Sequence, residues 1–315
     1  MLLSLLLAVA FAAVRLRDLF AVVMLFGIYS LLTAAFFMNL DAVDVAFTEA
    51  AVGAGVSTIL MLAALRLVGR HEKPHKHNPL LPLLVVCATG AALIYGLSDA
   101  PLVGDANAPA QTHVSPGYLN EAQKQTGIPN VVTAVLASYR GYDTLGETVV
   151  VFTAGLAILL LLGMSHPSPI ADFGSEDDQR VQRHAAKTLM PFILLYALYV
   201  QFHGDFGAGG GFQAGVIFAA GLVLYDLVFG HLHTRRVVKA GLLVRLAALG
   251  VLIYGGVGVY SLLAGKPYLD YSALAQDPVH GQHLGILLVE LGVGLTVFSA
   301  ITLIYFAFSA RRVKA

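Results

Sequence analysis

The feature that most constrains this chain is a succession of apolar runs, each close to the length of a membrane span. The hydrocarbon core of a bilayer is about 30 Å thick, and an α-helix crosses it in about 20 apolar residues. The runs, nine in number and bounded by charges, Gly or Pro, are 1–14, 19–40, 44–68, 80–97, 144–164, 189–203, 210–229, 241–264 and 284–309. The sequence therefore predicts an all-α polytopic integral membrane protein with about nine transmembrane helices, of which the first is short.

Composition excludes several other classes of protein. Hydrophobic residues make up 57% of the chain and charged residues only 12%, whereas globular proteins carry about 25% charged residues. Lys plus Arg equals Asp plus Glu at 19 each, so no net charge attracts nucleic acid. The single cysteine, Cys87, lies in an apolar run and indicates neither a disulfide framework nor a thiolate metal site. His71, His75 and His77 are typical of a solvated loop, and we expect no metal and no cofactor in this chain.

Basic residues fall in alternate connections, as the positive-inside rule requires if the N-terminus is outside and the C-terminus inside. The acid-tinged segment 98–127 is then expected to be an outer loop, and 165–188 an inner linker between two halves. The basic clusters are Arg15 and Arg17; Arg66, Arg70, Lys73 and Lys76; Arg180, Arg183 and Lys187; Arg235, Arg236 and Lys239; and Arg311, Arg312 and Lys314.

Three glutamates, Glu49, Glu147 and Glu290, lie inside apolar runs. An ionisable residue at the centre of a membrane helix costs roughly 2.5 to 3.5 kcal/mol on insertion scales, so each one needs a reason. All three lie on helices predicted to run from outside to inside, one to two turns below the outer boundary. Their common depth predicts an external half-channel for protons or cations. The alternative is that such carboxyl groups only pack helices together as hydrogen-bond donors.

The neighbours of these glutamates favour contacts with protein over contacts with lipid. Gly53 and Ser57 follow Glu49 at i+4 and i+8, a stripe of small residues that another helix can approach. Arg140, Asp143 and Glu147 share one helix face, where the arginine can keep Asp143 ionised. We therefore assign Arg140 and Asp143 to the pathway as well.

The other polar features near the spans are weaker signals. Asp226 lies near the inner end of its run and is expected to interact with Arg235 and Arg236. The three glycines at 209–211 are not a phosphate loop, because no Gly-Lys-Ser/Thr follows. Their backbone, free of Cβ atoms, admits a candidate polar cluster at the start of the next helix. That cluster comprises His203, Asp205 and Gln213.

Long stretches of the chain resemble known membrane proteins. Residues 191–230 and 283–298 resemble the B subunit of the Mrp-type multisubunit sodium/proton antiporters. Residues 15–32 and 44–55 resemble one part of the C-terminal region of the antiporter's A subunit. That part is itself similar to the D subunit of hydrogenases. Residues 129–154 resemble the E-like part that follows. The resemblance divides the chain into a D-like three-helix segment (1–77), an E-like two-helix segment with an outer loop (78–164), a cytoplasmic linker (165–188) and a B-like four-helix domain (189–315).

The resemblance implies a multi-pass component of a bacterial inner-membrane assembly that exchanges sodium ions for protons, with other antiporter subunits as partners. Glu49 and Glu147 match the family's acids for which ion-pathway roles are proposed. Ala208 and Val43 replace family prolines, which removes a φ constraint but no polar group. Two other functions stay open: the membrane arm of a redox-driven pump, such as a hydrogenase or a complex I-like enzyme, and a structural scaffold. None of the three makes this chain itself an enzyme.

Overall fold

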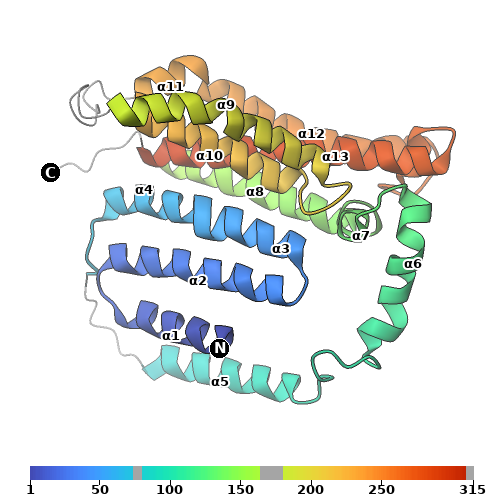
Figure 1. Cartoon of the computed structure of the whole chain (residues 1–315), viewed down its shortest axis with the longest axis horizontal. Coiled ribbons are helices and arrows are strands. Elements are labelled where there is room, and N and C mark those ends of the chain that lie inside the picture. Colours follow the sequence, from blue (N-terminus) through green and yellow to red (C-terminus); the bar gives the residue numbers. More distant parts are fainter. Residues whose placement is uncertain (74–79, 164–179, 310–315) are drawn as a thin grey trace. The chain divides into compact units, whose positions relative to one another are not determined.

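The computed structural model describes residues 1–73, 80–163 and 180–309, and these form helices (Figure 1). The β structure among them is one isolated antiparallel bridge between Asp18 and His71. Within the described residues, 8 helices are long and apolar enough to cross a membrane, which confirms an all-α polytopic membrane protein. They are α2 (Leu19–Asn39), the continuous run α3, η1 and α4 (Val43–Val68), α5 (Leu80–Leu97), α8 (Gly141–Leu162), α9 (Arg180–His203), α10 (Gly211–Phe229), α12 (Ala240–Leu263) and α13 (Pro278–Ser309).

The first predicted span forms α1 (Leu2–Arg15), a helix of 14 residues that is too short to count among these. It packs along α2. That this helix crosses the bilayer stays a prediction, and so does the orientation with the N-terminus outside and the C-terminus inside.

The chain divides into two units, Glu72–Glu121 and the remainder. The smaller unit holds α5, η2 (Ala110–Val114) and most of α6 (Ser115–Thr126). The expected outer loop over 98–127 is therefore helical in its second half. The reason is local, because the stretch Glu121–Thr126 consists mainly of residues with good helix propensity, which the Pro, Gly and Asn around it obscure.

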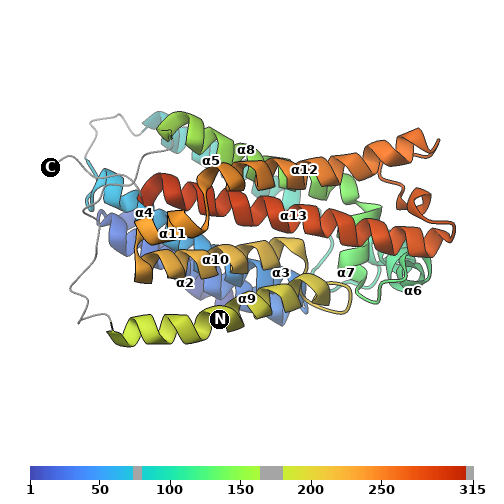
Figure 2. The ribbon, with the colours of Figure 1, turned by 90° about the horizontal axis from the view of Figure 1, so that it is seen from above.

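Helix α13 is the centre of the larger unit. It contacts α4, α8, α10 and α12, and Figure 2 shows it between α10 and α12. Its apolar residues Ile286, Val289 and Val297 are almost completely buried. Glycines let the neighbouring helices approach closely, since a Cβ added at Gly292 would lie 2.7 Å from the carbonyl oxygen of Gly250 in α12. The core of the protein thus lies around α13.

The third span is not one regular helix. It begins as α3 (Val43–Thr48), widens into the π-helix η1 (Glu49–Ser57) and ends as α4 (Thr58–Val68). The small-residue stripe from Glu49 through Gly53 to Ser57 was expected from α-helical spacing, but these residues form a π-helix. A π-turn contains an extra residue, and such turns are frequent at functional sites. Gly53 still faces α2, where an added Cβ would lie 2.5 Å from Ser30 Oγ.

Helices α9 and α13 begin well before their apolar runs do. Most of the expected linker 165–188 lies outside the described residues, but α9 already begins at Arg180. Helix α13 begins at Pro278, where Asp277 Oδ2 accepts a 3.0 Å hydrogen bond from the His280 amide. Hydropathy misses such ends because their first turns are polar. The division into four parts stays a prediction.

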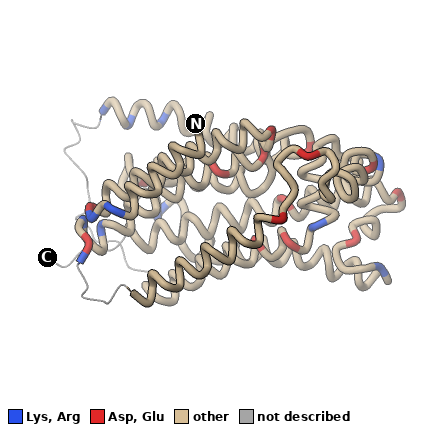
Figure 3. The backbone as a smooth tube through the Cα atoms, turned by 90° about the horizontal axis from the view of Figure 1, so that it is seen from below, with Lys and Arg blue, Asp and Glu red and all other residues tan. Residues whose placement is uncertain are grey.

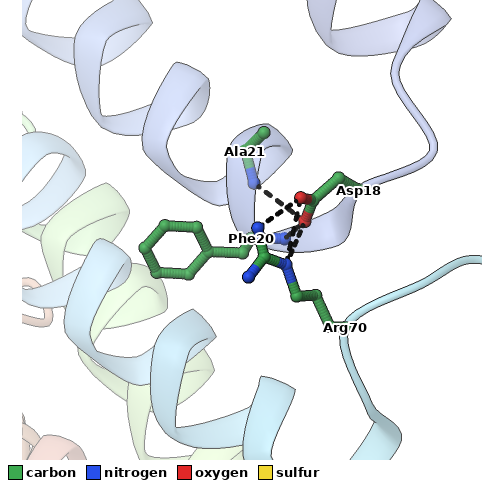
Figure 4. Close-up of polar contacts among 4 residues, drawn as sticks. All are labelled: Asp18, Phe20, Ala21 and Arg70. Carbon is green, nitrogen blue, oxygen red and sulfur yellow. Dashed lines mark hydrogen bonds and ion pairs between the residues drawn. The ribbon is translucent and has the colours of Figure 1, made fainter.

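Charged residues are unevenly distributed along the larger unit. Most Lys and Arg lie towards the end where α4 finishes and α9 begins, and most Asp and Glu lie in the opposite half (Figure 3). At the basic end, Arg70 Nη2 forms a 2.7 Å ion pair with Asp18 Oδ2. Asp18 also accepts hydrogen bonds from the amides of Phe20 and Ala21 as the N-cap of α2 (Figure 4). The hydrogen bond from Arg70 lowers the pKa of Asp18 below its usual value. This contact ties the start of α2 to the end of α4.

Candidate ion-pathway cavity

A cavity of about 250 Å³ lies in the larger unit among α3, α7 (Val131–Ala134), η3 (Val135–Tyr139), α8, α10 and α13. It can hold several water molecules, because one water takes about 30 Å³ in the liquid. Its wall is mostly apolar, with a small set of polar groups. These are the carboxyl groups of Asp44, Glu147 and Glu290, the hydroxyl groups of Thr48, Thr133, Thr144 and Thr148, and the amide of Gln213.

Glu290 is the buried carboxyl group of the cavity, with 8% of its surface exposed. The glycines at 209–211 pack directly over it. Gly210 has φ +114°, and a Cβ added there would lie 3.1 Å from Glu290 Oε1. A Cβ at Gly211 would collide with the carbonyl oxygen of Glu290. The glycine run is therefore needed for α10 to begin against α13 at this residue.

Asn130 joins three segments at the edge of the cavity. Its Nδ2 lies 3.3 Å from Asp44 Oδ1, 3.1 Å from the Gly204 carbonyl oxygen and 2.9 Å from that of Gly207, and its two N–H groups are shared among these three acceptors. Thr133 Oγ1 also donates to the Gly204 oxygen, at 2.6 Å. Asp44 and the loop that leads to α10 are thus held to α7 by side-chain donors.

A second chain of hydrogen bonds crosses the cavity wall. Gln213 Nε2 donates to Thr48 Oγ1 at 2.8 Å, and that hydroxyl donates to the Asp44 carbonyl oxygen at 2.9 Å. Thr48 of α3 therefore orients the side-chain amide of Gln213 in α10. Together with Asn130, this arrangement fixes the backbone of Asp44 from one side and its carboxylate from the other.

Glu147 lies in the α8 wall of the cavity and is exposed on the surface of this chain. The predicted neighbours do pair, since Arg140 Nη2 lies 2.6 Å from Asp143 Oδ2, with both side chains at least half exposed. Buried phenols fix this part of the wall. Tyr254 donates a 2.7 Å hydrogen bond to the Gly141 carbonyl oxygen, and Tyr271 a 2.8 Å bond to that of Ala137.

The structure does not bring all the predicted residues together. Glu49 is not among the residues that line the cavity. Its Oε1 lies 2.6 Å from the position of a Cβ on Gly53, on the side that faces α2. His203 instead stacks on Tyr199 with 4.8 Å between ring centroids, and Asp205 Oδ2 lies 2.9 Å from Nε2 of His283. Of the expected polar cluster, Gln213 alone lines the cavity.

Four polar residues of this region, Asp44, Thr48, Asn130 and His283, were not predicted as site residues from the sequence. Asp44 and Asn130 had weak signals, since each is a polar residue immediately before an apolar run. The signal at Asn130 reflects a helix N-cap, because Asn130 Oδ1 accepts from the Val132 amide at 2.9 Å. It does not reveal where the amide nitrogen points.

Comparison with known proteins covers almost the whole chain. Residues 181–303 match the domain related to the MnhB subunit of Na⁺/H⁺ antiporter, residues 4–70 match the D subunit of MBH, and residues 84–176 match its E subunit. A probable A/B subunit of a K⁺/H⁺ antiporter from Rhizobium meliloti (strain 1021) is 27% identical over 94% of this chain and 32% of its own length. The chain thus spans about a third of that relative. The B subunit of the Na⁺/H⁺ antiporter of Alkalihalophilus pseudofirmus is 32% identical over 38% of this chain and 89% of its own length.

Two solved structures are similar in fold and sequence. One chain of the Mrp complex from Dietzia sp. DQ12-45-1b gives a TM-score of 0.73 at 28% identity, over 96% of this chain and 34% of that one. A chain of the membrane-bound sulfane sulfur reductase, an archaeal respiratory membrane complex, gives a TM-score of 0.58 at 26% identity. The match covers 74% of this chain and 98% of that one. The chain belongs to the family of Mrp-type multisubunit antiporter subunits, with a B-like domain that follows D-like and E-like segments.

Proposed function

We propose that this chain is one component of a multisubunit cation/proton antiporter in a bacterial inner membrane, and that the cavity around Glu290 lies on its ion pathway. One observation supports this most directly. The cavity takes one carboxyl group from each of the three matched regions: Asp44 from 4–70, Glu147 from 84–176 and Glu290 from 181–303. Each of the three matched regions thus supplies one acid to a common space.

The chemistry of the cavity suits exchange. Glu290 is buried, and a carboxyl group in a poorly solvated space is not stably ionised without a compensating cation or proton. Carboxylates, hydroxyls and carbonyl oxygens at irregular backbone are also the groups that hold sodium ions in membrane transporters. A proton and a monovalent cation therefore compete for the same acids, and such competition is the basis of antiport.

We assign different roles to the acids by their surroundings. Glu290 is the buried binding group, and Asp44 is oriented beside the loop by Asn130. Glu147 stands in the exposed wall, where it can pass protons or cations between the cavity and a neighbouring protein of the assembly. Arg140 and Asp143 form the polar approach to it. Glu49 faces α2, so we place it on a branch of the pathway separate from this cavity.

In this proposal the chain carries out transport and not catalysis, and the remaining antiporter subunits are its partners. Relatives are named for both K⁺ and Na⁺ exchange, so the test uses both cations. The complete assembly is expressed in a host without its own antiporters, and exchange is followed in everted vesicles with a pH-sensitive dye.

Glu147→Gln is the sharpest substitution because it keeps size and hydrogen bonding but removes the proton-binding group. We expect the rate of exchange to fall by about tenfold or more, since a positioned proton-transfer group typically contributes at least that much. Glu72→Gln is the matched control, because Glu72 is exposed and does not line the cavity. Normal exchange by the Glu147 variant, with the assembly intact, would remove this residue from the pathway. Normal exchange with Asp44, Glu147 and Glu290 all neutralised would favour a scaffold.

A second candidate is the membrane arm of a redox-driven pump. The matches to the D and E subunits of MBH and to the respiratory sulfane sulfur reductase complex favour it. The same acids would then serve pumping that depends on electron transfer in a partner. Purification in mild detergent discriminates between the two functions, because co-eluting iron-sulfur or nickel-iron proteins would support the redox arm.

A further inference from the structure

A second group of buried titratable side chains lies at the opposite end of α10 from the cavity. Asp226 Oδ1 lies 3.0 Å from Nδ1 of His231, the first residue of α11 (His231–Val237), and the two side chains are only 5% and 10% exposed. Asp226 Oδ2 accepts a 2.9 Å hydrogen bond from the hydroxyl of Tyr305 in α13. Arg235, one of the two arginines expected near this aspartate, interacts with it electrostatically.

Residues of α13 flank the ring of His231. Phe306 meets its ring edge to face, with 5.2 Å between centroids, and Ser309 Oγ lies 3.5 Å from Nδ1. Two arginines of the described part of the chain interact electrostatically with the cluster: Arg235, which lies over the Phe306 ring, with Asp226, and Arg66 of α4 with Tyr305. Nε2 of His231 is buried and has no hydrogen-bond partner among the described residues.

This arrangement leaves one ring nitrogen able to take a proton. With Asp226 ionised, Nδ1 donates to the carboxylate and the Nε2 lone pair remains available. A proton that binds there produces an imidazolium ion beside a carboxylate that Tyr305 holds in place. Histidine is the side chain best suited to exchange a proton near neutral pH.

A purely structural contact explains less of what is observed. If the contact with Asp226 only anchored α11 after the turn at Gly230, where φ is +89°, it would need only one ring nitrogen of His231. It would give no reason for a carboxylate buried in a membrane helix, nor for the second nitrogen buried without a partner, and both are costly.

We propose that Asp226 and His231 form a second proton-binding site, which takes part in proton transfer at the end of the pathway remote from the cavity. This proposal rests on the proposed antiport function. The separation along α10 from Gln213 to Asp226 is about 20 Å at 1.5 Å per residue, so this site is distinct from the cavity. Along α13, between Glu290 and Tyr305, the hydroxyl residues Thr296, Ser299 and Thr302 are fully buried.

The test compares Asp226→Asn and His231→Gln with His233→Gln in the complete assembly. His233 lies on the same short helix but is exposed, so it is the matched control. We expect both cluster variants to lose about tenfold or more of the exchange rate, or to shift its pH optimum by at least one unit, while the control is unchanged. A second readout is infrared difference spectroscopy of the purified assembly during a pH titration. A histidine ring band should disappear in His231→Gln and persist in the control.

Each outcome decides for or against the site. Exchange and titration spectra of His231→Gln that equal those of the control would overturn it, even if Glu147→Gln abolishes exchange and the proposed function stands. If both cluster variants fail to assemble, Tyr305→Phe decides, because it removes only the hydroxyl that donates to Asp226. We expect a shifted pH profile for it, and an unchanged profile would overturn the proposal.

Discussion

Gln213 of α10 donates a hydrogen bond from Nε2 to Thr48 Oγ1 of α3, across 165 positions of the chain. The two residues belong to the B-like and D-like regions, and both line the cavity. The bond therefore connects two regions that match separate families.

A double-mutant cycle with Gln213→Leu and Thr48→Val measures this connection. Hydrogen bonds between membrane helices have an average coupling energy of about 0.6 kcal/mol in such cycles, and we expect a value of that order. Unfolding in mixed micelles with increasing dodecyl sulfate supplies the free energies. Additive single effects would show that the bond contributes nothing to the packing of α10 on α3.

Substitution of Gly211 by alanine tests the close crossing of α10 and α13. The new methyl group collides with the Glu290 carbonyl oxygen, and overpacking of this kind costs about 1–3 kcal/mol. We expect lower stability in the same micelle assay and reduced exchange. Gly256→Ala in α12 is the matched control, because nothing lies within 4 Å of its added Cβ. Equal stability of the two variants would contradict the crossing described above.

Asn130 combines two roles that different substitutions separate. Asn130→Ala removes both the helix cap, worth about 1 kcal/mol, and the bridge from Asp44 to the glycine loop. Asn130→Asp keeps the cap but places a second carboxylate against Asp44 and the carbonyl oxygens. We therefore expect the aspartate variant to retain most of the stability but to lose exchange in everted vesicles. An aspartate variant with full exchange would show that the bridging donor is unnecessary.

The ion pair between Asp18 and Arg70 predicts a small pH dependence of stability. The pKa of Asp18 is lowered from 3.8 by the hydrogen bond with Arg70, so its contribution is complete above that value and disappears as pH falls through the lower folded pKa. Asp18→Asn keeps the helix cap and removes the charge. We expect this variant to be slightly less stable than the parent at pH 7 in the micelle assay. The difference should shrink on acidification below pH 4, whereas a constant difference would show that the charge is irrelevant.

The sequence by itself determined the class of this protein. Runs of apolar residues near the length of a bilayer predict membrane helices because every backbone polar group must find a partner within the chain. The same reasoning singled out Glu147 and Glu290, since an acid within such a run is costly. It was less accurate where local chemistry is polar, so it missed the first turns of α9 and α13 and the helix α6. The π-helix at Glu49 was also missed, because residue spacing alone does not distinguish π from α hydrogen bonding.

Tertiary structure alone decided which acids share a cavity. Periodicity assigns a residue to a helix face but does not say which helix lies opposite that face. Asp44 reaches the cavity because Asn130 and the glycine loop pack over the start of α3, while Glu49, on the same span, faces α2. The Asp226 and His231 pair likewise depends on the turn that brings α11 back against α13. Contacts of this kind depend on the packing of distant segments, which no local pattern specifies.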